Sequence, residues 1–258
     1  MAEGASEVVV VADRQTRGRG ATGSWECPAG EGLLMSVAFR PQNIRAGESF
    51  RLLQASSLAV CLILEPLLAP PSEFCILNSE LAAPPPSLLP PHSEFCILNS
   101  ELAAPPPSLL TIKWPNDIFY GDKKLCGILI ENTLRGSVIE TCTIGIGLNL
   151  RQQKFPKELE HAVSLCQLTP NVPDNLTLAG QIADGLLSRL SSPTLMADYM
   201  RRLYRREGIH LFREKGGEPF EARIVGLNPD GGLRLRRRNG RLRVYRFKEI
   251  EFILPHRG

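Results

Sequence analysis

The sequence predicts an α+β fold, in which a mixed β-sheet domain with helices on one face precedes a small C-terminal β-barrel. Apolar runs and alternating segments typical of strands recur between residues 7 and 150, and few segments show helical spacing. Beyond residue 217, short strand patterns alternate with tight-turn signals. We therefore expect two domains, 1–212 and 217–258, joined by a linker at 214–217.

The first domain is expected to contain four strand regions and one long helix. Strand patterns lie at 7–12, at 33–40, from 111 onward, and over 138–150. The four consecutive valines of the first region predict a buried strand. The segment 48–65 reads as a buried helix that closes near Pro66.

Two further helices are expected before the barrel. Leu178, Ile182 and Leu186 recur at helical spacing. A second helix is predicted to begin at a cap formed by Ser192 and Pro193 and to stop at Gly208.

The C-terminal barrel carries clear turn signals and many arginines. Turns are predicted at 228–231 and at 239–240, the latter as a two-residue hairpin. The arginines alternate with apolar positions, as on the solvated face of a half-buried sheet, although nucleic-acid binding is the competing interpretation. They are Arg234, Arg236, Arg237, Arg238, Arg241, Arg243 and Arg246, alternating in part with Leu233, Leu235, Leu242 and Val244.

One segment departs from this pattern, because SEFCILNSELAAPPPSLL occurs at 72–89 and again, unchanged, at 93–110. The proline runs at 84–86 and 105–107 break any long element. Two copies are fewer than a solenoid normally needs. We expect an exposed, poorly ordered insertion at about 72–110, because lengthening a surface loop adds little closure entropy.

Composition narrows the protein class. The chain has 258 residues and a net charge of +3, which is too weak to imply nucleic-acid binding by itself. Its seven cysteines form no CxxC pair, which suits free thiols in a reducing cytoplasm. No signal peptide is recognised, and the apolar run at 58–64 is too short to span a bilayer. A cytoplasmic protein without membrane contact is expected.

The stretch KWPNDIFYGDKKLCGILIE at 113–131 is the strongest chemical signal. It gathers Lys113, Asn116, Asp117, Lys124 and Gly127 around a predicted hairpin. Lysine can neutralise charge on a phosphoryl group, aspartate can hold a metal ion, and glycine allows a ligand to approach the backbone. The pattern favours a site for a nucleotide phosphate and a carboxylate, but an ordinary exposed hairpin remains an open alternative.

Four blocks in this order resemble the biotin protein ligases of the short type that lacks a DNA-binding domain. They are ADRQTRGRGATGSWECPAGEGLLMSVAFRP (12–41), KWPND (113–117), KLCGILIE (124–131) and IGIGLNL (144–150). The resemblance implies a catalytic sheet domain of the biotin/lipoate ligase type and an SH3-like C-terminal barrel. It covers nearly the whole chain apart from the duplicated insert.

The resemblance also implies a two-step reaction. Biotin and ATP, with Mg²⁺, would form biotinyl-5′-AMP and pyrophosphate. The biotinyl group would then pass to a lysine of biotin carboxyl carrier protein, a subunit of acetyl-CoA carboxylase. Homodimerisation through the sheet edge is possible in this family, and no nucleic-acid partner is expected for this chain.

Residue roles follow from the same resemblance. Lys124 matches the catalytic lysine that bridges the biotin carboxylate and the α-phosphate. The residues matching the biotin and adenylate site are Gln15, Gly18, Arg19, Gly20, Ala21, Trp25 and Gly127. Those matching the ATP and Mg²⁺ side are Lys113, Asn116, Asp117 and Asn149, with Asp117 as the metal contact through Mg-ATP. Trp25 could equally be a core residue, and Asn149 could merely shape a turn.

Two departures from the family pattern stand out. The chain begins just after the place of a Ser-Thr-Asn-type turn that contacts the biotin head group, so we expect one pocket wall to be missing. Ala21 stands where the family often has a basic or long polar residue, which predicts looser retention of the adenylate.

Alternatives from other classes remain. A truncated or inactive homologue could bind nucleotide or carrier protein without turnover. The lipoate-ligase class shares the adenylation chemistry, but the GRG loop and KWPND point away from it. A biotin-responsive repressor would need a helix-turn-helix, for which we see no place before residue 7.

Overall fold

The computed structural model describes residues 7–15, 18–19, 24–25, 27–68 and 109–255, which all belong to one compact unit. The duplicated insert and the predictions made for it lie outside these residues, apart from the last two residues of the second copy. Leu109 is exposed, and Leu110 begins a strand and is buried.

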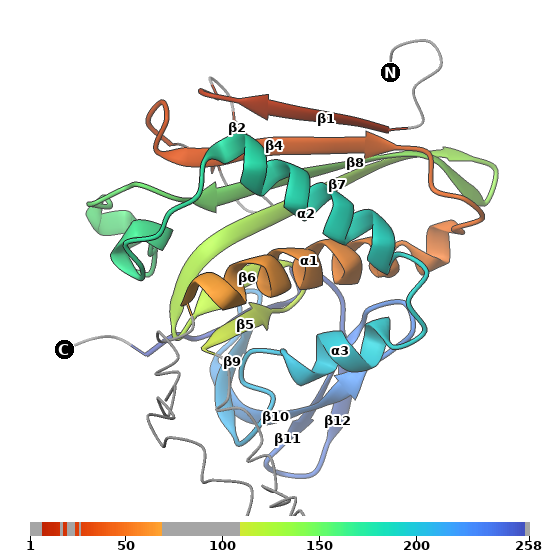
Figure 1. The fold of residues 1–258 in the computed structure, drawn as a ribbon. Helices are drawn as coiled ribbons and strands as arrows, with labels where there is room; N and C mark the ends of the chain where they lie inside the picture. Colours follow the sequence, from red (N-terminus) through yellow and green to blue (C-terminus); the bar gives the residue numbers. More distant parts are fainter. Residues whose placement is uncertain (1–6, 16–17, 20–23, 26, 69–108, 256–258) are drawn as a thin grey trace, which may run out of the picture. The chain divides into compact units, whose positions relative to one another are not determined.

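A six-stranded sheet forms the body of the protein (Figure 1), with strand order β1-β4-β8-β7-β6-β5. All neighbouring strands in it are antiparallel. The strands are β1 (Glu7–Ala12), β4 (Gly32–Phe39), β5 (Leu110–Lys113), β6 (Asp117–Tyr120), β7 (Lys123–Arg135) and β8 (Val138–Asn149). A separate short ribbon pairs β2 (Gly18–Arg19) with β3 (Ser24–Trp25).

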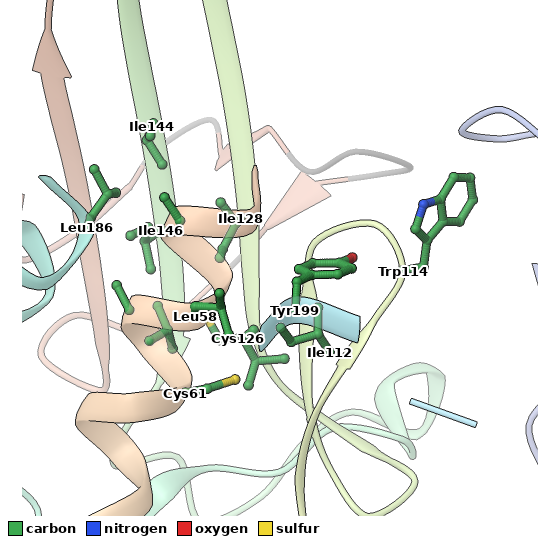
Figure 2. Close-up of a cluster of buried hydrophobic side chains, with 14 of the residues drawn as sticks. Leu58, Cys61, Ile112, Trp114, Cys126, Ile128, Ile144, Ile146, Leu186 and Tyr199 are labelled. Atoms are coloured by element: carbon green, nitrogen blue, oxygen red, sulfur yellow. The ribbon is translucent and has the colours of Figure 1, made fainter. Parts of the chain in front are cut away.

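Helices α1 (Phe50–Leu68) and α2 (Asn175–Arg189) pack against each other and against this sheet. Figure 2 shows the resulting core, where Leu58 and Cys61 of α1 meet Cys126 and Ile128 of the sheet. The even-numbered residues of β7 and β8 supply this face because side chains alternate along a strand. The predicted α+β fold class is confirmed. The sheet was predicted to be mixed, but its described strands are all antiparallel, because each connects to or lies beside a strand of opposite direction.

Helix α1 is longer than the sequence interpretation suggested. It continues through Pro66 to Leu68 rather than closing at the proline. By length and composition the segment Ala46–Leu68 could cross a membrane, but more than half of its most apolar stretch is buried inside the protein. Its hydrophobicity is accounted for by the core that it forms with the sheet and α2.

The prediction of a buried first strand is wrong. Strand β1 has the predicted bounds, yet Val9 and Val10 are 41% and 54% exposed. The reason is its place in the sheet, because β1 is the outermost strand and pairs only with β4 among the described residues. A run of β-branched residues favours a strand but does not distinguish an edge from a centre.

Asp174 is the N-cap of helix α2, and its carboxylate accepts hydrogen bonds from the backbone N–H groups of Leu176 and Thr177. Helix α3 (Leu195–Arg201) is shorter than predicted and ends well before Gly208. Its N-cap is Thr194, not Ser192 or Pro193. Short 3-10 turns lie at Ala46–Glu48, before α1, and at Lys157–Leu159 and Leu165–Gln167, between β8 and α2.

The C-terminal region forms a five-stranded antiparallel sheet in the order β12-β11-β10-β9-β13. Its strands are β9 (His210–Glu214), β10 (Pro219–Leu227), β11 (Leu233–Arg237), β12 (Leu242–Tyr245) and β13 (Ile250–Phe252). Because β9 pairs with β10, residues 214–217 form a turn inside this sheet. The turn predicted at 228–231 is present, whereas residues 238–241 close a longer loop than the predicted two-residue hairpin.

The alternation of arginines with apolar residues holds on β11, where Leu233 and Leu235 are buried. It fails on β12, where Leu242 and Val244 are 43% and 41% exposed because β12 is the outer strand. Several arginines pair with acids of the same sheet, including Arg237 and Arg243 with Glu214 and Arg238 with Glu221. These pairs agree with the solvated-face interpretation.

The described cysteines are all free, as predicted. Cys27, Cys61, Cys126 and Cys142 are buried, and Cys166 is partly exposed. Burial raises the pKa of the Cys61 thiol to about 12. Such thiols stay protonated and behave as small apolar side chains.

Candidate functional site

One face of the six-stranded sheet is open, and its strand register defines the site. Pairing brings Leu34, Gly147, Gly127, Asp117 and Lys113 into one row across five neighbouring strands, from β4 to β5. Directly opposed residues in a sheet point to the same face. The row therefore places the KWPND motif at one end of a shared surface and the glycines at its middle.

The IGIGLNL motif of β8 explains why few side chains rise above this surface. Ile144 and Ile146 point to the helices, while Gly145 and Gly147 lie on the open face. A β-carbon added at Gly145 would meet only the carbonyl oxygen of Leu129, at an ordinary contact distance of 3.8 Å. Packing of the protein itself therefore does not require glycine here, and the missing side chain leaves room above the strand.

That room is a cavity of about 270 Å³, large enough to hold a small organic molecule. Residues from β1, β4, β6, β7 and β8 and from the segment after β1 line it. They are Val10, Ala12, Gln15, Leu34, Met35, Ser36, Asp117, Lys124, Gly127, Ile128, Leu129, Glu131, Thr143, Gly145, Ile146 and Gly147.

A lysine and an aspartate stand together in the cavity wall. Lys124 Nζ lies 2.7 Å from Asp117 Oδ1, and the two side chains are 34% and 23% exposed. An ion pair this accessible can open to admit an anionic ligand. It offers a cation for a carboxylate or phosphate and a carboxylate that holds that cation in place.

A β-bulge aims Lys124 into the cavity. Strands β6 and β7 pair Ile118 with Cys126 but Phe119 with Lys124, so β7 has one extra residue at this point. With regular alternation Lys124 would share the helix-covered face with Cys126. The extra residue instead places it on the open face with Asp117, as bulges beside functional sites commonly do.

A neighbouring segment fixes the backbone at the bulge. The N–H of Lys124 donates to the carbonyl of His161 at 2.6 Å, and the N–H of Val163 donates back to the carbonyl of Lys124 at 3.0 Å. Asn149 supports the same segment, because its Nδ2 donates to the carbonyl of Val163 at 3.1 Å. Asn149 is buried and does not line the cavity. Its hydrogen bond holds the segment that fixes the backbone of Lys124.

The other residues of KWPND are largely buried. Asn116 is 6% exposed, and its Nδ2 donates to the carbonyl of Ile128, which ties the turn before β6 to strand β7. The ammonium of Lys113 lies over the rings of Phe119 and Phe252. Burial is the largest influence on Lys113 and lowers its pKa. Neither Asn116 nor Lys113 lines the cavity.

The predicted biotin and adenylate residues are described only in part. Gln15 and Gly127 line the cavity. Gly18 is buried in β2 and pairs with Trp25 of β3, and Arg19 pairs with Ser24. The side chains of Arg19 and Trp25, and the residues Gly20 and Ala21, lie outside the description, so their roles stay predictions.

Three polar cavity residues were missed by the sequence interpretation: Ser36, Glu131 and Thr143. They lie beyond the glycines, with Glu131 paired to Thr143 and Ser36 paired to Gly145. Their period-two spacing from the glycines within each strand was the available signal.

The described residues contain no group of three or more His, Cys, Asp or Glu able to hold a metal ion. Asp117 is a single carboxylate already paired with Lys124, so by itself it does not form a site for a resident metal ion. Mg²⁺ commonly binds through one or two carboxylates together with substrate phosphates.

Comparison with known proteins identifies the family. A model of the biotin/lipoate A/B protein ligase family matches residues 2–149. The chain belongs to this family. The match includes KWPND, the lysine of the bulge and the glycine floor, so the cavity lies within the family domain.

Relatives in the family carry ligase names. The chain is 29% identical over 203 residues to a biotin–acetyl-CoA-carboxylase ligase of Mycobacterium tuberculosis, covering 76% of this chain and 60% of that protein. It is 31% identical over 163 residues to the bifunctional ligase/repressor BirA of Bacillus subtilis, covering 62% and 38%. The chain thus spans less than two thirds of the length of these relatives.

Solved structures share the fold. The biotin protein ligase from Aquifex aeolicus in complex with biotin and ATP superposes with a TM-score of 0.65 at 20% identity, covering 96% of this chain and 89% of that one. The biotin protein ligase from Leishmania major in complex with biotinyl-5-AMP gives 0.56 at 23% identity, covering 93% and 89%. At these identities the similarity establishes the fold, and it agrees with the predicted catalytic-domain type.

Proposed function

We propose that this chain is an ATP-dependent, AMP-forming biotin ligase of the cytoplasm. It activates biotin to biotinyl-5′-AMP and transfers biotin to a lysine of a biotin carboxyl carrier protein, a subunit of acetyl-CoA carboxylase. The observation that carries the proposal is Lys124, which a β-bulge directs beside Asp117 into a glycine-floored cavity. Membership of the family and the names of the relatives support the substrate class.

In the first step a biotin carboxylate oxygen attacks the α-phosphorus of ATP. The new acyl-oxygen–phosphorus bond forms as the bond from the α-phosphorus to the bridging oxygen breaks, and pyrophosphate leaves. Two anions must approach each other, so a cation between them lowers the barrier. Lys124 supplies this charge, and its ammonium exchanges part of its contact with Asp117 for the incoming carboxylate and phosphate.

Asp117 has two roles in this scheme. Before ligands bind, its carboxylate keeps the Lys124 ammonium at the cavity wall through the 2.7 Å ion pair. When Mg-ATP binds, Asp117 would hold the Mg²⁺ ion, and the ion would supply positive charge to the phosphates. Lys113 and Asn116 flank it on the nucleotide side, where Asn116 fixes the turn and Lys113 adds positive charge.

The floor of the cavity receives the uncharged part of biotin. Gly127, Gly145 and Gly147 leave the backbone exposed to the ring system of the ligand. Ser36, Glu131 and Thr143 offer polar atoms at the far side, which suit a ligand with hydrogen-bonding groups opposite its carboxylate.

In the second step the neutral amine of the carrier lysine attacks the activated acyl carbon. An amide bond forms, the bond between the acyl carbon and the phosphate oxygen breaks, and AMP leaves with the electron pair of that bond. The attacking amine gives up one proton to water. Burial of the mixed anhydride against the sheet would keep water away until the amine arrives.

The direct test supplies the protein with biotin, MgATP and a purified carrier domain. Mass spectrometry of the intact carrier should show the addition of one biotinyl group, and a carrier whose acceptor lysine is replaced by arginine serves as the control. ATP and biotin binding without any mass gain would favour the alternative of a homologue that binds ligands without turnover.

A further inference from the structure

Two neighbouring residues of KWPND contact the C-terminal sheet. Trp114 Nε1 donates to the carbonyl of Gly231 at 2.9 Å, and its ring lies edge-on to Phe247 at 6.4 Å. Figure 2 shows this ring at the edge of the buried cluster, away from Leu58. Gly231 has φ +88° and sits against Phe50, so the turn that accepts the hydrogen bond is itself closely packed.

Lys113 makes the second contact. Its Nζ lies 5.2 Å from the centre of the Phe119 ring on β6 and 5.8 Å from the centre of the Phe252 ring on β13. One ring belongs to the six-stranded sheet and the other to the C-terminal sheet. An ammonium within about 6 Å of two ring faces gains cation–π attraction from both.

The Phe252 ring is firmly placed. It is 8% exposed and packs against Phe212 and Tyr204, with ring centres 5.0 Å and 6.2 Å away. Lys113, in contrast, has a long flexible side chain with many rotamers, and holding it in one place costs conformational entropy. A fixed ring can therefore restrict where the ammonium lies.

Charged groups surround the Lys113 ammonium and would otherwise decide where it lies. Lys113 pairs with Asp117 across β5 and β6, on the face that also carries Lys124. The charged groups acting on Lys113 are Asp117, Lys124, Glu251 and Arg205. Without the rings, the attraction of Asp117 and the repulsion of Lys124 would decide the position of a partly desolvated ammonium.

We propose that Phe252 is a positioning residue for the nucleotide side of the site, acting through Lys113. Its ring on the C-terminal sheet keeps the Lys113 ammonium beside the Asp117–Lys124 pair, so that ATP meets a preformed cation. The proposal rests on the proposed function for its kinetic consequence, but the placement of Lys113 by the ring is testable without any activity.

The kinetic test removes the ring while retaining apolar volume. Phe252→Leu should raise KM for ATP about three- to tenfold. The KM for biotin and kcat should stay within about twofold of wild type, because only one ATP-side contact is weakened. Phe252→Tyr keeps the ring and should restore a near-normal KM for ATP. Phe220→Leu is the matched control, since Phe220 carries a cation–π contact with Arg237 in the same sheet. Among the described residues, Lys113 lies over Phe119 and Phe252 and not over Phe220.

A double-mutant cycle tests the route through Lys113. In a Lys113→Met background, Phe252→Leu should add less than about twofold to KM for ATP. An effect of Phe252→Leu that is as large in this background as in wild type would overturn the proposal. Equal effects of Phe252→Leu and Phe220→Leu would also overturn it, because both would then reflect general weakening of the sheet.

A second measurement does not depend on turnover. Limited acylation with an amine-reactive reagent, followed by peptide mass spectrometry, reports how accessible each lysine is. Lys113 should label several-fold faster in Phe252→Leu than in wild type or Phe220→Leu, while exposed Lys154 labels equally in all three. Unchanged labelling of Lys113 would overturn the positioning role. Faster labelling in a chain that binds no ATP would retain it and reject the proposed function.

Discussion

On strand β8, the face beneath helices α1 and α2 carries Ile144, Ile146 and Leu148, whereas the opposite face carries Thr143, Gly145 and Gly147. The first face is filled by side chains from both helices (Figure 2). The second has almost no side-chain volume and bounds the cavity. Over residues 143–148 of β8, the even-numbered residues thus face the core and the odd-numbered ones face the cavity. We therefore expect that a substitution can change stability or ligand binding without changing the other.

The largest expected effect on the open face comes from Lys124. Lys124→Ala should lower biotin-dependent pyrophosphate release by about 100- to 1000-fold, because a preorganised charge at the reacting atoms is lost. Thermal stability should change little, since the side chain is partly exposed and its ion pair is accessible. The neighbouring Lys123→Ala serves as the matched control, and pyrophosphate release that survived in Lys124→Ala would remove this lysine from the reaction.

The largest effect on the covered face is expected at Ile144. Ile144→Ala should lower the free energy of unfolding by about 2–5 kcal/mol, because it leaves a cavity in a fully buried site. Denaturant titration followed by circular dichroism measures this loss. The folded fraction should bind biotin as wild type does, and a matching loss of affinity would show that the two faces are not separable.

Gly145→Ala, on the open face, should weaken biotin binding and leave stability intact. The added methyl group has room within the protein, so the free energy of unfolding should stay constant or rise by up to about 1 kcal/mol. The same methyl intrudes on the cavity, and biotin affinity should fall about tenfold or more. Calorimetric titration of biotin measures the affinity, and unchanged binding would place the ligand elsewhere.

The covered face should also show a pH dependence through Cys61. Burial raises its pKa to about 12 in the folded protein, against an ordinary value of 9.0. The unfolded chain therefore releases this proton first, so the stabilising contribution is complete below about pH 9 and is lost as pH rises toward 12. The free energy of unfolding should fall between about pH 8 and pH 10.5, more steeply in wild type than in Cys61→Ala.

Cys166→Ala is the control for this measurement, because Cys166 is partly exposed. A slope that stays the same in Cys61→Ala would mean that another group titrates.

The smallest effect is expected from the duplicated segment. Deleting residues 72–92 removes one repeat period and keeps the copy that leads into Leu110 of β5. Stability should change by less than about 1 kcal/mol, since loop length affects closure entropy only logarithmically. Biotin affinity should match wild type, and a loss of solubility would show that the segment packs against the rest of the chain.

The sequence predicted much of the sheet, because the alternation of apolar and small residues in β4, β7 and β8 indicates which residues lie on each face. It did not reveal that β1 is an edge strand. Four valines satisfy an edge and a centre equally, and only the pairing partners distinguish them.

The sequence also did not predict which face of the sheet carries Lys124. Simple alternation from Gly127 would put this lysine on the helix-covered face, and the bulge that corrects it depends on pairing between β6 and β7. Its assignment rested on resemblance. For Asn149 the sequence left two roles open, contact with ATP or shaping of a turn. Its amide donates to the carbonyl of Val163, and its contact with ATP stays a prediction.

We propose above that Lys124, which lies beside the glycines of the cavity, promotes the reaction of biotin with ATP. Biotin-dependent exchange of labelled pyrophosphate into ATP measures that step alone, without a carrier protein. We expect wild type to catalyse exchange only when biotin is present, and Lys124→Ala to lose it while Lys123→Ala retains it. Exchange that is absent from folded wild-type protein, or that does not require biotin, would contradict the account.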